Sequence, residues 1–193
     1  DGRSNALIVL KNEPSVAARN TAGILADHLK QICGGEFVIV TEAALGDVKV
    51  VDQKIVASAE PLVENFILIG ESKLAQALGA TVDGLGPGGV LIRTLPNALV
   101  LLGPSKTTPS DQSGTRYAVT TFLEDSLGCR FLWPGELGKV VPKRATIEIE
   151  PINHQFTPVL RQRRIRMASG YGDRKDKGVI RLGFNEADYH RIQ

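Results

Sequence analysis

Residues 90–102, Val90-Leu-Ile-Arg-Thr-Leu-Pro-Asn-Ala-Leu-Val-Leu-Leu102, decide the fold class. Two apolar runs, 90–94 and 98–102, flank Leu95-Pro-Asn97, and this order is typical of a β-hairpin. In the rest of the chain, strand-like runs are separated by helix-like ones, a pattern that alone predicts an all-parallel sheet. Because a hairpin adds an antiparallel pair, the sequence predicts a mixed sheet.

Upstream of the hairpin, short apolar runs predict three more strands, at residues 6–10, 36–41 and 65–70. Ser15 can cap a helix over residues 16–32, and Gly34-Gly35 can end that helix in the left-handed conformation. The stretch from residue 42 to about residue 60 is polar and predicts a loose connection. Ser72 can cap a short helix over residues 73–78.

Downstream of the hairpin, a second long helix is expected from Ser113 to about Leu127, with Gly128 as its end. Its broad apolar side comprises Tyr117, Val119, Phe122, Leu123 and Leu127. Short extended pieces are expected at residues 129–133, 139–141 and 146–150. The predicted fold is therefore an α+β sandwich, in which a mixed β-sheet carries two long helices on one face.

Composition points to a globular chain with two parts of opposite charge. The 193 residues are 42% hydrophobic and carry a net charge of +2, and no apolar run is long enough to span a membrane. Residues 155–193 hold nine basic and four acidic side chains, whereas the preceding residues have a net charge of −3. This change of sign suggests two units with different surroundings.

Candidate catalytic and metal-binding residues do not form a recognised pattern. His28, His154 and His190 lack ligand or triad spacing, and the neighbours Glu124 and Asp125 would point about 100° apart on a helix. We therefore expect no catalytic residue, no metal site and no cofactor. Cys33 and Cys129 fit no redox spacing; two buried thiols are favoured over a disulfide.

Two glycine-rich segments have simpler explanations than ligand binding. Gly84-Leu-Gly-Pro-Gly-Gly89 leads into a strand, whereas a phosphate-binding loop requires a helix N-terminus, so a tight connection is expected. Gly70-Glu-Ser72 lacks the Gly-x-Ser-x-Gly pattern of a nucleophile turn, so Ser72 is interpreted as a helix cap.

The basic run Arg161-Gln-Arg-Arg-Ile-Arg166 could neutralise phosphates of a nucleic acid. It lacks flanking aromatic residues and an accompanying basic helix, and the rest of the chain is acidic, so we expect no nucleic-acid partner. Two alternatives remain for residues 161–166. They could form a strand whose alternate side chains face solvent, or their arginines could face an interior lined with carboxylates that this chain does not contain.

Three segments together resemble a known accessory domain. Gly114-Thr-Arg-Tyr-Ala-Val119, continuing through Phe122-Leu-Glu-Asp125 to Leu127-Gly-Cys-Arg-Phe-Leu132, resembles its most specific signature. The first helix of that domain is resembled by the segment with Val16-Ala-Ala18, Leu25-Ala-Asp-His-Leu29 and Gly34-Gly35. Its strand and helix-cap segment is resembled by Ile67-Leu-Ile-Gly-Glu-Ser72. The relatives are the N-terminal domains of α-glucuronidases (glycoside hydrolase family 67), the second domain of β-N-acetylhexosaminidases (family 20) and, closest, the uncharacterised bacterial domain of unknown function 4838.

This resemblance implies a zincin-like α/β sandwich without the metal site, followed by a (β/α)8 barrel that carries the chemistry. Thr157-Pro-Val-Leu-Arg-Gln-Arg163 resembles the first barrel strand, and Arg163 would correspond to an arginine that reaches the sugar. Leu160 departs from the family's pattern, since an aromatic residue is expected there, and the residues after Arg164 lack the Gly-x-x-x-Asp pattern. The implied division is an accessory domain over residues 5–152, with residues 153–193 as the start of a truncated barrel or a disordered tail.

The sequence thus predicts a non-catalytic accessory domain of a larger glycoside-hydrolase-like protein. Its expected partners are the downstream barrel of the same chain and, through the longer protein, a glycan; the resemblance implies secretion or a periplasmic location. Whether the longer protein is itself catalytic stays open. The alternatives are a separate carbohydrate-binding module, which would need exposed aromatic rings, nucleic-acid binding through residues 161–166, and an independent small hydrolase.

Overall fold

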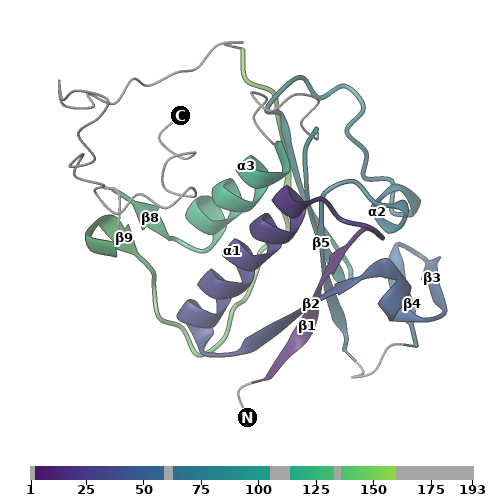
Figure 1. The fold of residues 1–193 in the computed structure, drawn as a ribbon, viewed down its shortest axis with the longest axis horizontal. Helices are drawn as coiled ribbons and strands as arrows, with labels where there is room; N and C mark the ends of the chain where they lie inside the picture. Colours follow the sequence, from purple (N-terminus) through teal and green to yellow (C-terminus); the bar gives the residue numbers. More distant parts are fainter. Residues whose placement is uncertain (1–2, 59–62, 105–113, 133–135, 160–193) are drawn as a thin grey trace, which may run out of the picture.

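A six-stranded mixed sheet forms the centre of the molecule (Figure 1). The computed structural model describes residues 3–58, 63–104, 114–132 and 136–159. The strand order is β10-β6-β7-β5-β1-β2, with bounds Arg3–Leu10 (β1), Glu36–Thr41 (β2), Asn65–Ile69 (β5), Val90–Leu95 (β6), Ala98–Leu102 (β7) and Asn153–Phe156 (β10). Strands β2, β1, β5 and β7 are parallel, whereas β6 is antiparallel to β7 and β10. The predicted hairpin and mixed sheet are confirmed.

Two helices lie side by side on one face of the sheet, as predicted (Figure 1). Helix α1 spans Val16–Cys33 and α3 spans Gly114–Thr121. The buried residues of both helices pack against the helix-facing side chains of the strands and form one core with them. The helices contribute Leu25, Leu29, Ile32, Ala118 and Val119 to this core. The alternation of the strands therefore sets which side chains meet the helices, because residues two apart point to the same face.

The other face of the sheet carries smaller elements around a second core. These are η1 (Glu42–Leu45), the hairpin of β3 (Val48–Val51) and β4 (Lys54–Ala57), and α2 (Lys73–Ala77). The prediction of a loose connection over residues 42–60 was wrong for residues 42–57. Asp52 and Gln53 form the two-residue turn between β3 and β4, with φ of 48° and 61°. Turns with positive φ at both positions usually contain Asn-Gly or Asp-Gly, so this sequence did not indicate one.

Both ends of α1 form as the sequence predicts. The Ser15 hydroxyl accepts a hydrogen bond from the Ala18 amide at 3.2 Å, and Gly34 has φ 76° while its amide donates to the Lys30 carbonyl. Ser72 likewise caps α2 by accepting from the Ala75 amide at 3.1 Å. These caps use contacts within a few residues, so local sequence is sufficient to specify them.

The second long helix changes its winding halfway. Helix α3 ends at Thr121, and a π-helical turn, η2 (Phe122–Ser126), follows; Ser113 lies outside the described residues. The Leu127 amide donates to the Phe122 carbonyl at 3.3 Å, the i to i−5 bond of this wider turn. Phe122, Leu123 and Leu127 are all fully buried, so the predicted apolar side forms the core contact. Gly128, at φ 78°, ends the helix.

The chain after η2 crosses the molecule and returns to the sheet. It forms β8 (Arg130–Phe131), η3 (Glu136–Gly138) and β9 (Lys139–Val140), and then an irregular segment that includes residues 146–150. The extended piece expected at residues 146–150 pairs with none of the described strands. Strand β10 then pairs with β6, from Asn153↔Arg93 to Phe156↔Val90. The sheet thus continues four residues beyond the domain boundary expected at residue 152.

Candidate functional site

A cavity of about 710 Å³ lies at the amino-terminal edge of the parallel strands, on the helix side of the sheet. Three walls surround it: the starts of β1, β5 and β7, the carboxyl-terminal part of α1 with η2, and residues 145–149, here called the strap. Cavities that hold small molecules typically measure about 300–1,000 Å³. Its volume lies within this range, so we consider it a candidate binding site.

The cavity exists because the helices leave this edge of the sheet uncovered. Helix α1 ends at Cys33, and the strap lies over the helix side of the sheet beyond it, with Ile147 and Ile149 half-buried against the core. Ala6 lies on the same face of β1 as the buried Ile8, since the two are two residues apart. Its methyl group is too small to fill the space under the strap.

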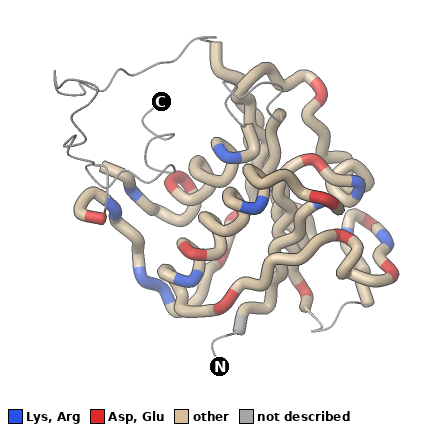
Figure 2. Tube along the Cα trace, viewed as in Figure 1, with Lys and Arg blue, Asp and Glu red and all other residues tan. Residues whose placement is uncertain are grey.

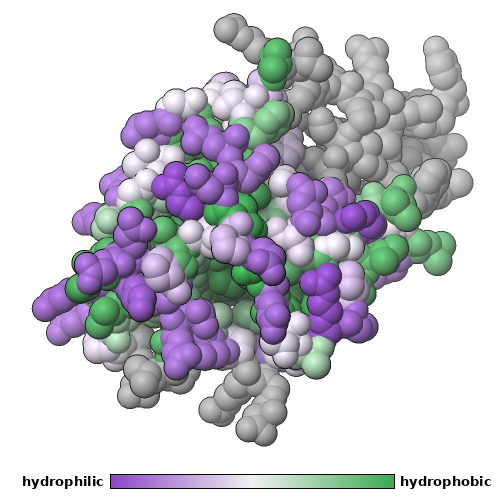
Figure 3. Space-filling view, turned by 180° about the vertical axis from the view of Figure 1, so that it is seen from behind, coloured by the Kyte–Doolittle hydropathy of each residue, from purple (hydrophilic) through white to green (hydrophobic). Residues whose placement is uncertain are grey.

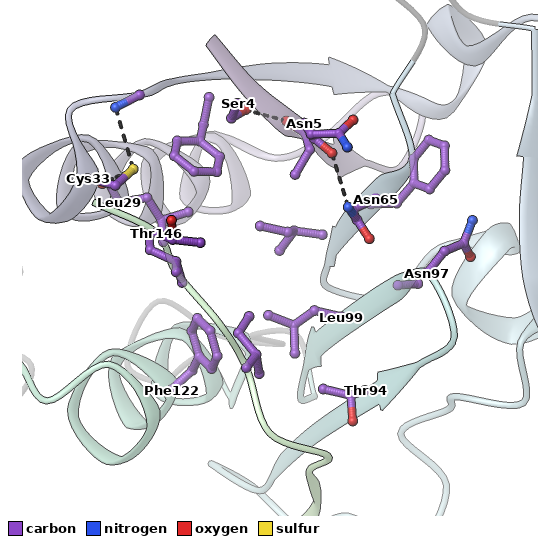
Figure 4. A pocket seen from close by; sticks show the side chains of 18 of the residues that line it. Ser4, Asn5, Leu29, Cys33, Asn65, Thr94, Asn97, Leu99, Phe122 and Thr146 are labelled. Carbon is purple, nitrogen blue, oxygen red and sulfur yellow. Dashed lines mark hydrogen bonds between the residues drawn. The ribbon is translucent and has the colours of Figure 1, made fainter. Parts of the chain in front are cut away.

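Figure 4 shows Leu29, Phe122 and Thr146 on one side of the cavity. Leu29, Leu99 and Phe122 have at most 4% of their surface exposed, so the half-buried Phe37, Ile147 and Ile149 form the accessible apolar wall. Asparagines stand on the opposite side, at the strand starts and the hairpin turn. The Asn65 Nδ2 donates to the Asn5 carbonyl at 3.3 Å, and Asn5 bonds the Glu64 amide and carboxylate at 3.0 Å each.

Asn97 anchors the hairpin turn between β6 and β7 to the other face of the sheet. Its Nδ2 donates to the Ile55 carbonyl at 2.8 Å, and its Oδ1 accepts from the Ile55 amide at 2.9 Å. The carboxamide thus pairs with β4 as a neighbouring strand would. The sequence marked Asn97 only as a turn residue, because a partner 42 positions away leaves no local signal.

The described residues that line the cavity are all uncharged. The Cys33 thiol is the one titratable side chain among these described lining residues. Among the described residues, no group of three or more His, Cys, Asp or Glu side chains is placed to hold a metal ion. No described helix is long and apolar enough to cross a bilayer.

The histidines and acidic residues considered from the sequence are spread through the fold. His28 is buried, its Nδ1 lies 2.7 Å from the Ile24 carbonyl oxygen, and its ring is 5.5 Å from that of Phe131. His154 lies on β10 at the far edge of the sheet. Glu124 and Asp125 lie in η2. Arg163, the basic run 161–166 and His190 lie outside the described residues, so the sugar contact of Arg163 stays a prediction.

The two cysteines are free thiols in different surroundings. Cys129 is fully buried, and burial raises the pKa of its thiol. Cys33 is only partly buried and lines the cavity, where its Sγ accepts a hydrogen bond from the Gly35 amide at 3.4 Å (Figure 4). The expectation of a buried thiol therefore holds for Cys129 but not fully for Cys33.

Glu42 is a buried carboxylate with a structural role that the sequence did not indicate. Its Oε1 accepts a hydrogen bond from the Leu74 amide at 2.6 Å, at the start of α2. Together with Ser72 it satisfies two amides that a helix leaves unpaired at its first turn. Its partner lies 32 residues away, so no local pattern identifies it.

Basic side chains gather where the segment after β9 passes the end of α1 (Figure 2). The Lys143 ammonium donates to the Gln31 carbonyl, and the Arg144 amide donates to the Ile32 carbonyl at 2.9 Å. These contacts satisfy carbonyl groups at a helix carboxyl terminus, where the helix dipole favours positive charge. The arrangement therefore has a structural explanation and gives no support to a nucleic-acid interface.

Exposed apolar side chains mark a second candidate surface, which we call the β8–β9 patch: Leu132, Leu137 and Val140. Leu132 is 74% exposed and Leu137 is 102% exposed. Seen from behind, hydrophobic side chains protrude at the margin of the molecule (Figure 3). Val159, after the end of β10, is also largely exposed. Apolar groups grouped in this way are typical of a surface that another protein part covers.

Comparisons with known proteins do not place the chain in a family. No family model matches it, and no curated protein is significantly similar to it. The resemblance to accessory domains of glycan-processing enzymes consequently rests on the sequence segments themselves.

Proposed function

We propose that the described domain is a non-catalytic accessory module of a larger, secreted or periplasmic protein that acts on glycans. Two things support the proposal: the resemblance carried by residues 114–132, and the mixed sheet with two helices on one face, an α+β architecture compatible with the α/β sandwich that the resemblance implies. The finer likeness to a zincin-like sandwich is part of the proposal. Because β10 belongs to the sheet, the proposed module runs through Phe156.

The observation that carries the proposal is the β8–β9 patch. It directly follows η2, and Leu132 ends the segment with the most specific resemblance. An apolar side chain in water gains about 25 cal/mol per Å² when another surface covers it. In the proposed protein, the downstream barrel covers Leu132, Leu137 and Val140.

The coding sequence beyond Gln193 provides the first test. We expect it to encode a (β/α)8 barrel of about 250 residues with carboxylates at the ends of strands. A stop codon directly after the present chain, or a downstream sequence without strand–helix alternation, would contradict the proposal.

The second test measures association through the patch. The chain ending at Phe156 and the downstream region are produced as separate polypeptides, and their binding is followed by calorimetry. Leu132→Ser with Leu137→Ser should weaken binding by at least about tenfold, since two buried leucines are lost. Val51→Ser with Val56→Ser, at exposed positions of β3 and β4, is the matched control and should leave the affinity unchanged. Equal losses in both pairs would refute the assigned surface.

Absence of glycosidase activity in the isolated chain is also expected. Turnover of an aryl glycoside by the pure protein, abolished by a single Glu or Asp substitution, would show that the chain is an enzyme in its own right.

A second candidate function, direct carbohydrate binding, is favoured by one pair of rings. His154 and Phe156 stack on β10 with centroids 6.5 Å apart and an interplanar angle of 18°, and Phe156 is 50% exposed. They lie on the helix side of the sheet, opposite Ile92 and Val90. Flat exposed rings can stack on a sugar face. Binding to an oligosaccharide panel that disappears in Phe156→Ala would support this candidate, and an unchanged profile would exclude it.

A further inference from the structure

We infer that the cavity under the strap binds a small, uncharged, amphipathic molecule with an apolar body and one hydroxyl group. This inference does not depend on the accessory-module proposal. It rests on the size of the cavity, on the asparagines grouped on one side of it, and on the lack of charged side chains among the described residues that line it.

The apolar wall selects the body of the ligand. Phe37, Ile147 and Ile149 offer no hydrogen-bonding side-chain atom, and each is only partly buried, so it presents apolar surface to the cavity. A monosaccharide placed there would leave several hydroxyl groups without partners, and each such group costs about 1–3 kcal/mol. A planar or branched hydrocarbon body instead replaces water at these side chains.

The asparagine side selects the polar end. Asn65 uses its Nδ2 on the Asn5 carbonyl, and within the described part of the chain its Oδ1 accepts no hydrogen bond. Asn65 lies on the helix side of β5, two residues before the buried Ile67. The Oδ1 is an acceptor, so it matches a donor such as a hydroxyl group. At the other end of the cavity, the exposed Thr146 on the strap offers a second hydroxyl contact (Figure 4).

Charge excludes the common anionic ligands. A carboxylate or phosphate that leaves water needs a cationic partner or several amide donors, and the described lining contains neither Lys, Arg nor His. Acidic and basic ligands should therefore bind much more weakly than a neutral ligand of the same size.

The Cys33 thiol can report whether a molecule is bound in this cavity. Cys33 lines it and is partly exposed, whereas Cys129 is fully buried in the core. Labelling of the complete 193-residue chain with N-ethylmaleimide, followed by mass spectrometry, therefore measures access to Cys33. Because Cys33 also lines a shallower hollow beside Lys143 and Arg144, the cavity-filling variants described below are needed to assign protection to the cavity. Naphthol is the neutral probe, decanoate the charged probe and N-acetylglucosamine the polar probe; glutathione labelled in parallel corrects for direct effects on the reagent.

At a naphthol concentration ten times its dissociation constant, labelling of Cys33 should slow by about tenfold, because only the free fraction reacts. Decanoate and N-acetylglucosamine should give little protection. No protection by naphthol would overturn the inference, and equal protection by decanoate would overturn the assignment of an uncharged ligand.

Filling the cavity tests its location. Ala6→Leu should abolish protection by naphthol, whereas Ala44→Leu, at an exposed position of η1, should retain it. Circular dichroism checks folding. If Ala6→Leu does not fold, Thr146→Phe, at an exposed strap position, replaces it and should reduce protection likewise. Full protection in a folded filling variant would show that naphthol binds elsewhere.

Discussion

At the residue scale, Asn97 shows how one side chain connects the two faces of the sheet. Its carboxamide makes two hydrogen bonds with the backbone of Ile55 and thereby holds β4 against the turn of the central hairpin. Ile55 is buried, so the loss of these bonds leaves a backbone donor and acceptor without partners close to the second core.

We expect Asn97→Ala to lower the free energy of unfolding by about 1–3 kcal/mol, since buried polar groups lose their partners. Urea denaturation followed by circular dichroism measures the change. Asn20→Ala, at an exposed position of α1, is the control and should be neutral or slightly stabilising, because alanine has the higher helix propensity. A loss below about 0.5 kcal/mol for Asn97→Ala would mean that the two bonds contribute little.

At the element scale, three backbones meet where β7 ends and α3 begins. A Cβ atom on Gly103 would lie 2.2 Å from the Gly89 carbonyl oxygen, and one on Gly114 would lie equally close to it. The hydroxyl of Thr115 joins the same junction by donating to the Gly103 carbonyl at 3.0 Å. The glycine-rich turn is thus a close-packed connection, as its sequence context predicted.

Substituting Gly103 and Gly23 by alanine should therefore have opposite effects. Gly103→Ala should destabilise the fold strongly, because the clash is with backbone atoms that cannot move aside. Gly23→Ala, in α1, meets nothing within 4 Å and should raise the free energy of unfolding by about 0.5–1 kcal/mol. Thermal unfolding of both variants checks this. A Gly103→Ala protein as stable as the wild type would contradict the close approach.

The π-helical turn η2 provides a fully buried aromatic side chain to the helix-side core. Phe122 is fully buried, whereas Phe156 on β10 is 50% exposed, so the two make a matched pair. Phe122→Ala should cost about 3–5 kcal/mol of stability, and Phe156→Ala should cost less than about 1 kcal/mol. Chemical denaturation measures both. Similar losses in the two variants would place Phe122 outside the core.

At the scale of the whole molecule, the sheet lies between two hydrophobic cores and contributes side chains to both. Side chains of β1, β5 and β7 enter the helix-side core and the core under β3, β4 and α2 in alternation. Among the described strands, β2 and β10 each have one neighbour in the sheet. We therefore expect the central strands to be the last part of the domain to open.

Amide hydrogen exchange tests this order. Amides of Leu68 and Val100, which are fully buried on central strands, should exchange orders of magnitude more slowly than those of β10, where the side chains are exposed. Mass spectrometry after timed deuteration gives the rates. Equal protection of β10 and β5 would show that the edge strand opens only with the whole domain.

The fold class could be predicted from the sequence because its signals are local. The hairpin at residues 90–102, the caps at Ser15 and Ser72, and the helix end at Gly34 each depend on a few neighbouring residues. The periodic apolar positions around Phe122 also identified the buried side of α3. Each of these features uses hydrogen bonds or packing directions that short segments specify by themselves.

The candidate site could not be predicted, because distant segments create it. The cavity under the strap needs Ala6, Asn65 and Thr146 to meet at one edge of the sheet, and nothing local marks any of them. Strand β10 pairs with β6 about 60 residues earlier in the chain, and the Asp52–Gln53 turn lacks a glycine.

The sequence by itself therefore determined the helices, most strands and the mixed character of the sheet, since these follow from local propensity and from side-chain periodicity. The tertiary structure decided the strand order, the β10 edge, the Asn97 and Glu42 contacts and the position of the cavity. Those features depend on which surfaces pack together, and packing is a property of the complete chain.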